Sequence, residues 1–281
     1  MVKVNVGFLH PGSMGVSLAA SAQNSGNTAI WASAGRSAAT RKRAEQYNLT
    51  DAGTLDELCA TCTIIVSICP PHAAEAVATQ VLDCGFRGLF VDANAISVGR
   101  TRRIAAQIEG AGAHFVDGGV IGGPAWEPGR TWLYLAGESA AEVAKCFSAG
   151  PLETEVLGDE IGQAAALKMC FAAYTKGTTA LLAGILATAE ATGVREALES
   201  QWSRGGSAFA EQTRDRVRGV TAKAWRFAGE LDEIGATFDD AGVPSGFQEA
   251  AAEIYRRLAH FKDTDGMPAL DEVLAAILRA E

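Results

Sequence analysis

The start of this chain, from Val2 to Gly15, constrains its fold more than any other stretch: it reads VKVNVGFLHPGSMG. The apolar run that ends at Leu9 is too short for a buried helix and is typical of a buried strand. Gly12 and Gly15 follow with the spacing of the last two glycines in a G-x-G-x-x-G turn, and His10 stands in place of the first. Such a turn brings a pyrophosphate close to the backbone at a helix N-terminus, where free N–H groups favour negative charge.

Short apolar runs then alternate with helical patterns as far as residue 158. The expected strands after the first are 28–31, 63–68, 89–92, 114–117, 132–136 and 154–157. Strands that alternate with helices predict a mostly parallel, doubly wound α/β sheet of the Rossmann type over residues 1–158. We expect residues 118–124 to form a loop, and ligands to bind beyond the carboxyl ends of the parallel strands.

The pattern changes near Gly158. An alanine-rich helical pattern without proline runs from Glu160 to Glu190, long enough for an interdomain helix of roughly 45 Å. Further helices are expected at 197–202, 207–217, 222–241, 245–260 and 269–280. The sequence therefore predicts an all-helical domain over 159–281, whose apolar surplus suggests a substrate-binding and homodimer-forming role.

Composition excludes several classes of function. The net charge is −9, which argues against a nucleic-acid partner or an anionic membrane surface. No apolar run approaches the roughly 20 residues of a membrane span, and the first residues lack a signal-peptide layout, so we expect a cytoplasmic protein. Cys59 and Cys62 form a C-x-x-C without a second pair, which predicts free thiols rather than a metal site. A small molecule remains as the expected partner.

The end of the second expected strand bears on the choice of cofactor. An acidic residue there would bind the adenosine ribose and select NAD, but the chain carries Arg36, Ser37 and Arg41 instead. A guanidinium suits a 2′-phosphate, so the sequence favours NADP(H) over NAD(H). Arg43 is interpreted as part of a solvated helix face. The predicted cofactor-binding residues are His10, Pro11, Gly12, Ser13, Met14, Arg36, Ser37, Arg41, Cys69, Pro70 and Asn94.

Lys168 is the main candidate for chemistry. It lies on the long helix among apolar and small residues, where a solvated lysine is not expected. Its ammonium could donate a proton to a carbonyl oxygen, and desolvation would bring its pKa toward the working range. The competing interpretation is a lysine whose head reaches solvent at a dimer surface. Lys176, about two turns later, is interpreted as structural or substrate-orienting.

Three motifs make the chain resemble the β-hydroxyacid dehydrogenase superfamily, which includes 6-phosphogluconate and 3-hydroxyisobutyrate dehydrogenases. Residues 7–15 are similar to its GFIGLGxMG motif, and residues 117–123 resemble D-x-P-V-S-G-G. Residues 162–168 match the start of its G-x-x-x-x-x-K-x-x-N-N motif. The resemblance implies hydride transfer between NAD(P) and a hydroxyacid, with Lys168 as proton relay and Asn94 near the reacting groups.

The chain also departs from that pattern. Ile121 stands in place of the motif serine, and Phe171 and Ala172 in place of the asparagines. These changes remove groups that would hold a small carboxylate, and they suggest an apolar pocket to which Trp126 also contributes. The expected catalytic residues are Lys168 and Asn94, and the expected substrate-binding residues are Val120, Ile121, Gly122, Gly123, Phe171, Ala172, Tyr174 and Trp225.

The leading hypothesis is therefore an NAD(P)-dependent dehydrogenase or reductase that acts on CH–OH groups, favours NADP(H) and takes a carbonyl or hydroxy compound with an apolar part. An imine reductase is one alternative, although that group often carries aspartate or tyrosine where this chain has Lys168. A second alternative is a dinucleotide-binding sensor without catalysis, which the departures from the motifs favour slightly.

Overall fold

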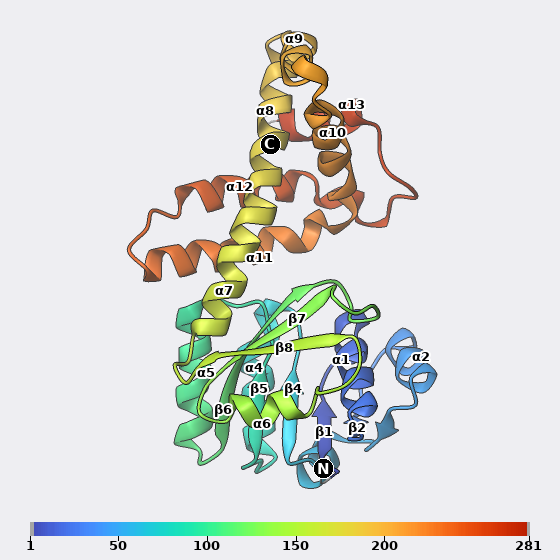
Figure 1. Ribbon diagram of the computed structural model, residues 1–281, viewed down its shortest axis with the longest axis vertical. Helices are drawn as coiled ribbons and strands as arrows, with labels where there is room; N and C mark the ends of the chain where they lie inside the picture. Colours follow the sequence, from blue (N-terminus) through green and yellow to red (C-terminus); the bar gives the residue numbers. More distant parts are fainter. Residues whose placement is uncertain (1–2, 280–281) are drawn as a thin grey trace. The chain divides into compact units, whose positions relative to one another are not determined.

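The computed structural model describes residues 3–279, so Val2 lies outside the described residues. The chain divides into two compact units, one that ends at Met169 and one that begins at Cys170 (Figure 1). The division falls within a helix, later than the boundary after residue 158 that the sequence predicts. The first unit keeps the start of this helix because the helix is hydrogen-bonded to the sheet, as described below.

The first unit is built on one eight-stranded sheet with the order β3-β2-β1-β4-β5-β6-β7-β8. Neighbouring strands are parallel except β6 and β7, which pair antiparallel. The strands are β1 Asn5–Phe8, β2 Thr28–Trp31, β3 Thr50–Asp51, β4 Ile64–Ser67, β5 Leu89–Asp92, β6 His114–Gly122, β7 Thr131–Ala136 and β8 Leu152–Gly158. The predicted Rossmann-type sheet is confirmed, and its strand order reverses between β1 and β4, where such sheets bind ligands.

Helices cover both faces of this sheet (Figure 1). They are α1 Ser13–Asn24, α2 Ala38–Gln46, α3 Leu55–Thr61, α4 Ala74–Asp83, α5 Val98–Gly110 and α6 Ala140–Lys145. One buried apolar cluster joins α1 and α6 to one face, through residues such as Val16 and Val143. A second cluster joins α3, α4 and α5 to the other, through residues such as Leu58 and Ile104. All residues of β4 and β5 are buried because helices pack against both faces of the sheet at these strands.

Strand β6 corrects one expectation. The sequence predicts a strand that ends at Asp117 and opens into a glycine-rich loop, but β6 continues to Gly122. The reason is β7, which pairs with it from Asp117 opposite Ala136 to Gly122 opposite Thr131. The two-residue strand β3 was not expected, because Thr50 and Asp51 carry no apolar pattern.

The second unit is helical, as predicted. Its elements are the end of α7 Gln163–Ala172, a π-helix Ala173–Gly177, α8 Thr178–Ala191, α9 Arg195–Trp202, α10 Phe209–Gly219, α11 Ala224–Asp240, α12 Gly246–Arg257 and α13 Leu270–Leu278. The π-helix interrupts what the sequence predicts as one α-helix. Arg216 Nη2 donates to Thr175 O at 2.8 Å and Tyr255 Oη donates to Lys176 O at 3.1 Å, so side chains from α10 and α12 satisfy carbonyls of this segment.

The helical stretch Gln163–Ala191 also modifies an expectation about membranes. By length and composition alone it could span one, with a mean hydropathy of 1.2 over its most apolar window. Core helices of soluble proteins pass the same test, and 44% of this window is buried inside the protein. The apolar composition therefore fits a helix that packs against other helices.

Candidate functional site

The turn between β1 and α1 has the geometry of an anion-binding site. Gly12 N donates to His10 O at 2.7 Å, which closes the turn, and no side chain caps the start of α1. Nothing lies within 4 Å of the position that a Cβ on Gly12 would take, so the approach to the backbone is open. The backbone N–H groups of Ser13 and Met14 at the helix start suit a phosphate.

Gly15 fills the packing role of the last glycine in the fingerprint. A Cβ there would collide with His10 O and lie 3.0 Å from Ile68 Cγ2. The turn therefore stays close to α1 even though His10 replaces the first glycine.

His10 and Arg36 each carry a buried nitrogen without a hydrogen-bond partner among residues 3–279. The atoms are His10 Nδ1 and Arg36 Nε. Burial, with a smaller contribution from Arg36, lowers the pKa of His10 to about 4, so the imidazole is neutral at pH 7. Burial also lowers the pKa of Arg36, against an opposing interaction with Cys69 at the end of β4. Arg36 is thus a partly desolvated cation that interacts with His10 and with Cys69, which suits an anionic ligand.

The loop after β2 is held by its own polar groups. Ser37 Oγ accepts from Thr40 N at 3.3 Å and caps α2, while Arg41 Nη2 donates to Ser33 O at 2.7 Å. Sequence reasoning missed Asp51 on β3, whose Oδ1 accepts from Ser33 N at 3.2 Å and from Gly53 N at 2.8 Å. An acidic residue therefore does reach this loop, but one of its oxygens is occupied by backbone.

Arg43 departs from the interpretation as a solvated residue. Its Nε donates to Pro11 O at 3.3 Å, and its Nη2 donates to Thr40 Oγ1 at 3.2 Å. Arg43 thereby links α2 to the turn between β1 and α1. The link spans more than thirty positions of sequence, so no local pattern could have indicated it.

Asn94 joins the ends of β4 and β5. Its Oδ1 accepts from Cys69 N at 2.6 Å and its Nδ2 donates to Ser67 Oγ at 3.2 Å. Its own backbone N donates to Asp92 Oδ1 at 2.9 Å. The side chain is only 3% exposed, so Asn94 shapes the loop that carries Cys69 and Pro70.

Lys168 lies against the backbone of β6. Its Nζ donates to Val120 O at 2.6 Å. A Cβ added to Gly119 would lie 2.5 Å from Ala164 O and 3.2 Å from Lys168 Cβ, so α7 rests directly on the strand. Gly119 stands where the resembling family has proline, and the close approach explains why only a glycine fits this packing.

The predicted substrate-binding residues of β6 differ in how exposed they are and in which face of the strand they lie on. The side chain of Val120 belongs to the buried cluster on the α1 face, so only its carbonyl faces Lys168. Ile121 alternates onto the same face as Asp117 and Gly119 and is 8% exposed. Gly122 and Gly123 are exposed.

The predicted residues of the second unit are mostly open to solvent. Phe171, Tyr174 and Trp225 are exposed, and Lys262 lies over the ring of Trp225 at 4.3 Å. Ala172 is buried, so its side chain offers no surface to a ligand. Lys176 forms a 2.8 Å ion pair with Glu230 in which both side chains are largely buried, which agrees with a structural role.

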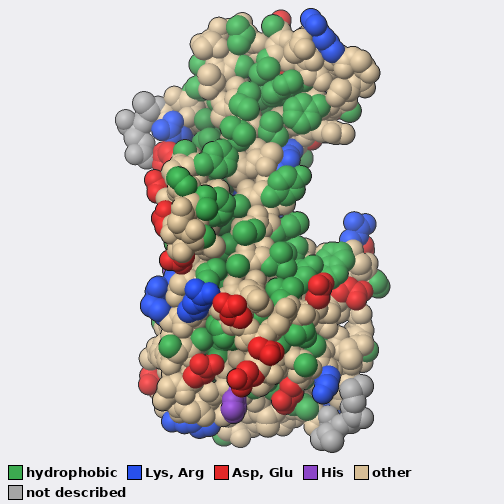
Figure 2. Space-filling model, turned by 60° about the vertical axis from the view of Figure 1, so that its left-hand side comes forward, with side chains coloured by type: hydrophobic (Ala, Val, Ile, Leu, Met, Phe, Trp, Pro, Cys, Tyr) green, Lys and Arg blue, Asp and Glu red, His purple; other side chains and the backbone are tan. Residues whose placement is uncertain are grey.

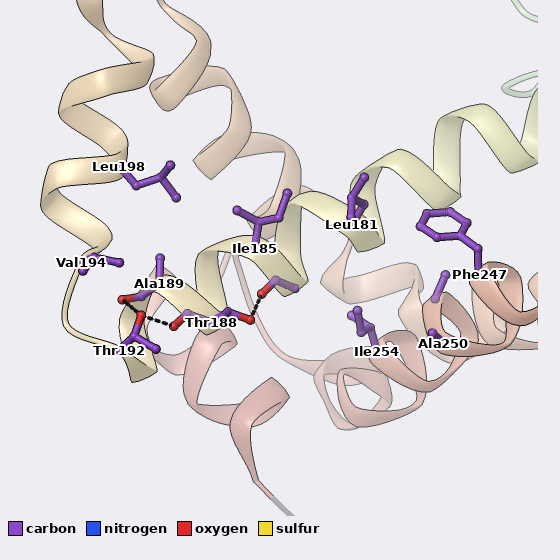
Figure 3. Close-up of a pocket in the computed structure, with 12 residues that line it drawn as sticks. Leu181, Ile185, Thr188, Ala189, Thr192, Val194, Leu198, Phe247, Ala250 and Ile254 are labelled. Carbon is purple, nitrogen blue, oxygen red and sulfur yellow. Dashed lines mark hydrogen bonds between the residues drawn. The ribbon is translucent and has the colours of Figure 1, made fainter.

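An apolar groove runs along α8, between α9 and α12, within the second unit (Figure 3). Its volume is about 590 Å³, and Leu181, Ile185 and Phe247 are among the side chains that face it. None of its lining residues is charged. Hydrophobic side chains gather over this helical unit in the space-filling view (Figure 2).

The cysteines are free; Cys59, Cys62 and Cys146 are buried, and Cys69 and Cys84 are partly buried. Burial raises the pKa of Cys59 and Cys62 to about 12, and that of Cys69 and Cys146 to about 11. Cys170 is exposed. Over the described part of the chain, no group of three or more His, Cys, Asp or Glu side chains could hold a metal ion.

Comparison with known proteins matches both units. Residues 5–148 match the NAD binding domain of 6-phosphogluconate dehydrogenase, and residues 189–258 match DUF1932, a domain of unknown function. An uncharacterised 28.5 kDa protein from Methanothermus fervidus is 27% identical over 201 residues, which cover 71% of this chain and 77% of that protein.

Two solved structures extend the similarity over nearly the whole chain. The conserved protein MTH1747, described as structurally similar to 3-hydroxyacid dehydrogenases, is 27% identical with a TM-score of 0.71 over 92% of this chain and 97% of its own. The 3-hydroxyisobutyrate dehydrogenase of Mycobacterium tuberculosis, solved with L-serine, is 18% identical with a TM-score of 0.72 over 99% and 100%. The second likeness is one of fold.

Proposed function

Because the chain belongs to the family of the NAD binding domain of 6-phosphogluconate dehydrogenase, we propose that it is an NADP(H)-dependent oxidoreductase acting on a carbonyl or hydroxy compound with an apolar part. The observation that carries the proposal is the contact of Lys168 with the sheet: its Nζ, on α7, donates to the β6 carbonyl of Val120 at 2.6 Å, in the same unit as the β1–α1 turn. A fixed, partly buried ammonium is suited to acid–base work.

The residues of the first unit fit a phosphorylated dinucleotide. The open, uncapped start of α1 offers N–H groups to the pyrophosphate, and Arg36 offers a guanidinium to a ribose 2′-phosphate. The end of β2 carries no acidic residue, and the nearby Asp51 already binds two backbone N–H groups. Neutral His10 adds no charge to the turn. When bound, NADP(H) supplies or accepts a hydride.

Lys168 holds the proton that balances this hydride. In the reducing direction its Nζ donates a proton to the substrate oxygen, so that a carbonyl becomes a hydroxyl. In the oxidising direction the neutral amine takes the hydroxyl proton. The hydrogen bond to Val120 O orients Nζ in both directions.

Ile121 supports an apolar substrate part. It lies on the face of β6 that Gly119 presents to α7, where the resembling motif has serine. Asn94 Nδ2, the side-chain group that could donate to a substrate carboxylate, already donates to Ser67 Oγ, and the residue is buried. We therefore expect a neutral carbonyl compound to be preferred over a β-ketoacid of the same size.

The test is NADPH oxidation, followed by absorbance, with β-ketoacids, aldehydes, aryl ketones and cyclic imines, and with NADH in parallel. We expect turnover of a carbonyl compound with NADPH preferred. Turnover of imines alone would identify an imine reductase. Silence across the panel, with NADPH bound at micromolar concentration, would favour the non-catalytic sensor.

We also propose that the uncharged groove of the second unit contributes to a homodimer. Leu181→Glu would place a charge beside its apolar lining, so it should raise the dissociation constant of the dimer at least about tenfold. Light scattering over a concentration series measures this. Leu278→Glu is the control, because Leu278 is similarly exposed but does not line the groove. A wild-type monomer at tens of micromolar would contradict the proposal.

A further inference from the structure

A buried carboxylate anchors the helix that carries Lys168. Asp117 on β6 is 1% exposed. Its Oδ2 accepts from Gly162 N and Ala164 N, each at 2.9 Å, and Ala165 N lies 3.2 Å from Oδ1 and 3.1 Å from Oδ2. One side chain thus satisfies N–H groups in the first turn of α7 that have no partner within the helix.

This anchor and Gly119 together fix α7 on the strand at two points. Asp117 and Gly119 alternate onto the same face of β6, and α7 covers both. Ala164, which donates to Asp117, also presents its carbonyl 2.5 Å from the position of a Gly119 Cβ. Lys168 follows Ala164 by four residues, about one turn, so it lies on the same side of the helix. Moving the first turn therefore moves Nζ away from Val120 O.

The charge of Asp117 matters as well as its shape. Burial raises the pKa of Asp117 to about 6, while the hydrogen bonds from the backbone N–H groups of Ala165, Gly162 and Ala164 act in the opposite direction. These hydrogen bonds favour the ionised form of the carboxyl group, as expected for an anion at the start of a helix. Asn at this position would lose the charge and would present at most one acceptor oxygen to three donors.

We propose that Asp117 is a positioning residue for Lys168: its carboxylate sets the register of α7 on β6 and thereby holds the Lys168 ammonium at the carbonyl of Val120. The inference rests on the proposed acid–base role of Lys168 for its catalytic meaning. The placement of Nζ, however, can be measured without any substrate.

The experiment follows the titration of Lys168 directly in the full-length protein. Lysines are dimethylated with ¹³C-formaldehyde, and the Lys168 signal is assigned by its absence in Lys168→Arg. We expect Asp117→Asn to shift the Lys168 titration midpoint by at least about 0.5 pH. Turnover with NADPH should fall at least about tenfold, its pH profile should move with the NMR midpoint, and the KM for NADPH should change less than about twofold.

Two further variants keep the test decisive. Thr54→Ala removes the cap of α3, which packs mainly against α4 and β1, and should lower the Tm without moving the Lys168 titration. Asp117→Ser keeps one acceptor oxygen and lacks the NH2 group that asparagine would turn toward the backbone N–H donors. It replaces Asp117→Asn if that variant does not fold.

An Asp117 variant with a lowered Tm but an unchanged Lys168 titration and pH profile would overturn the proposal. A shifted titration in a protein that turns over no substrate would support the positioning while refuting the proposed function. The two failures are therefore distinguishable.

Discussion

Two regions of the sheet differ in whether their buried polar side chains have hydrogen-bond partners. On the β1–β2 side, His10 Nδ1 and Arg36 Nε have no partner among the residues that the structure describes. On the β5–β6 side, Asn94 and Asp117 are tied to backbone and side chains of neighbouring elements. A buried polar group without a partner costs about 1–3 kcal/mol, so such groups are retained where a ligand completes them. The first side is therefore suited to binding, and the second to holding a catalytic group in place.

The largest expected effect comes from replacing Lys168. Lys168→Met should lower kcat at least about 100-fold while the NADPH dissociation constant stays within about twofold, because the proton relay is lost but the binding side is untouched. Steady-state kinetics and fluorescence titration measure the two quantities. Lys145→Met, an exposed lysine of α6, is the control. A variant that keeps its kcat would place the chemistry elsewhere.

Arg36 tests the binding side. Losing one charge-assisted contact of about 1.5–3 kcal/mol should weaken NADPH binding about 10- to 100-fold in Arg36→Ala. NADH lacks the 2′-phosphate, so its affinity should fall less than about threefold. Calorimetry at fixed salt compares the two affinities, with Arg130→Ala as control because Arg130 forms an exposed ion pair with Glu127. Equal losses for both cofactors would refute the assignment of Arg36 to the 2′-phosphate.

Asp92 is the exception on the satisfied side, and it gives the smallest effect. Its Oδ2 is buried without a partner among the described residues, and burial raises the pKa of Asp92 from 3.8 to about 7. The folded protein therefore binds this proton more tightly than the unfolded chain does. The contribution of this proton to stability is fully present below the unfolded pKa of 3.8. It is progressively lost as the pH rises through the folded pKa of about 7.

For a folded pKa of about 7, this one group should lower the free energy of unfolding by about 1.4 kcal/mol between pH 6 and pH 8. Asp92→Asn should remove that slope in urea titrations. Asp51→Asn is the matched control: the pKa of Asp51 is lowered by its hydrogen bonds, so its contribution changes only in acid, far below this window. An unchanged slope in Asp92→Asn would mean that the group is ionised throughout.

Local sequence patterns were sufficient for most of the fold. The strands at 28–31 and 89–92 are observed with the expected bounds, because a short run with three consecutive buried apolar residues has few alternatives. The length of β6 was not predictable, since it depends on pairing with β7 rather than on its own glycine-rich sequence. The π-helix likewise depends on Arg216 and Tyr255, which come from later helices.

The sequence predicted a site residue only where that residue is unusual among its neighbours along the chain. Lys168 stands out as a lysine among apolar neighbours, and the structure fixes it on the sheet. The anchoring role of Asp117 depends on α7, 45 positions further along the chain, and the link from Arg43 to Pro11 crosses two elements. Such contacts are set by how strands and helices stack, so spacing within the sequence does not reveal them.

The uneven burial of the cysteines has a practical consequence for spectroscopy. Thiol reagents attack the thiolate, and burial keeps Cys59, Cys62, Cys69 and Cys146 protonated and shielded. A maleimide dye should therefore label the exposed Cys170 first in the native protein. That position is one half-turn after Lys168 on α7, so the wild-type chain already carries an attachment point for a fluorescent reporter on the helix of its candidate catalytic group, without any engineered cysteine.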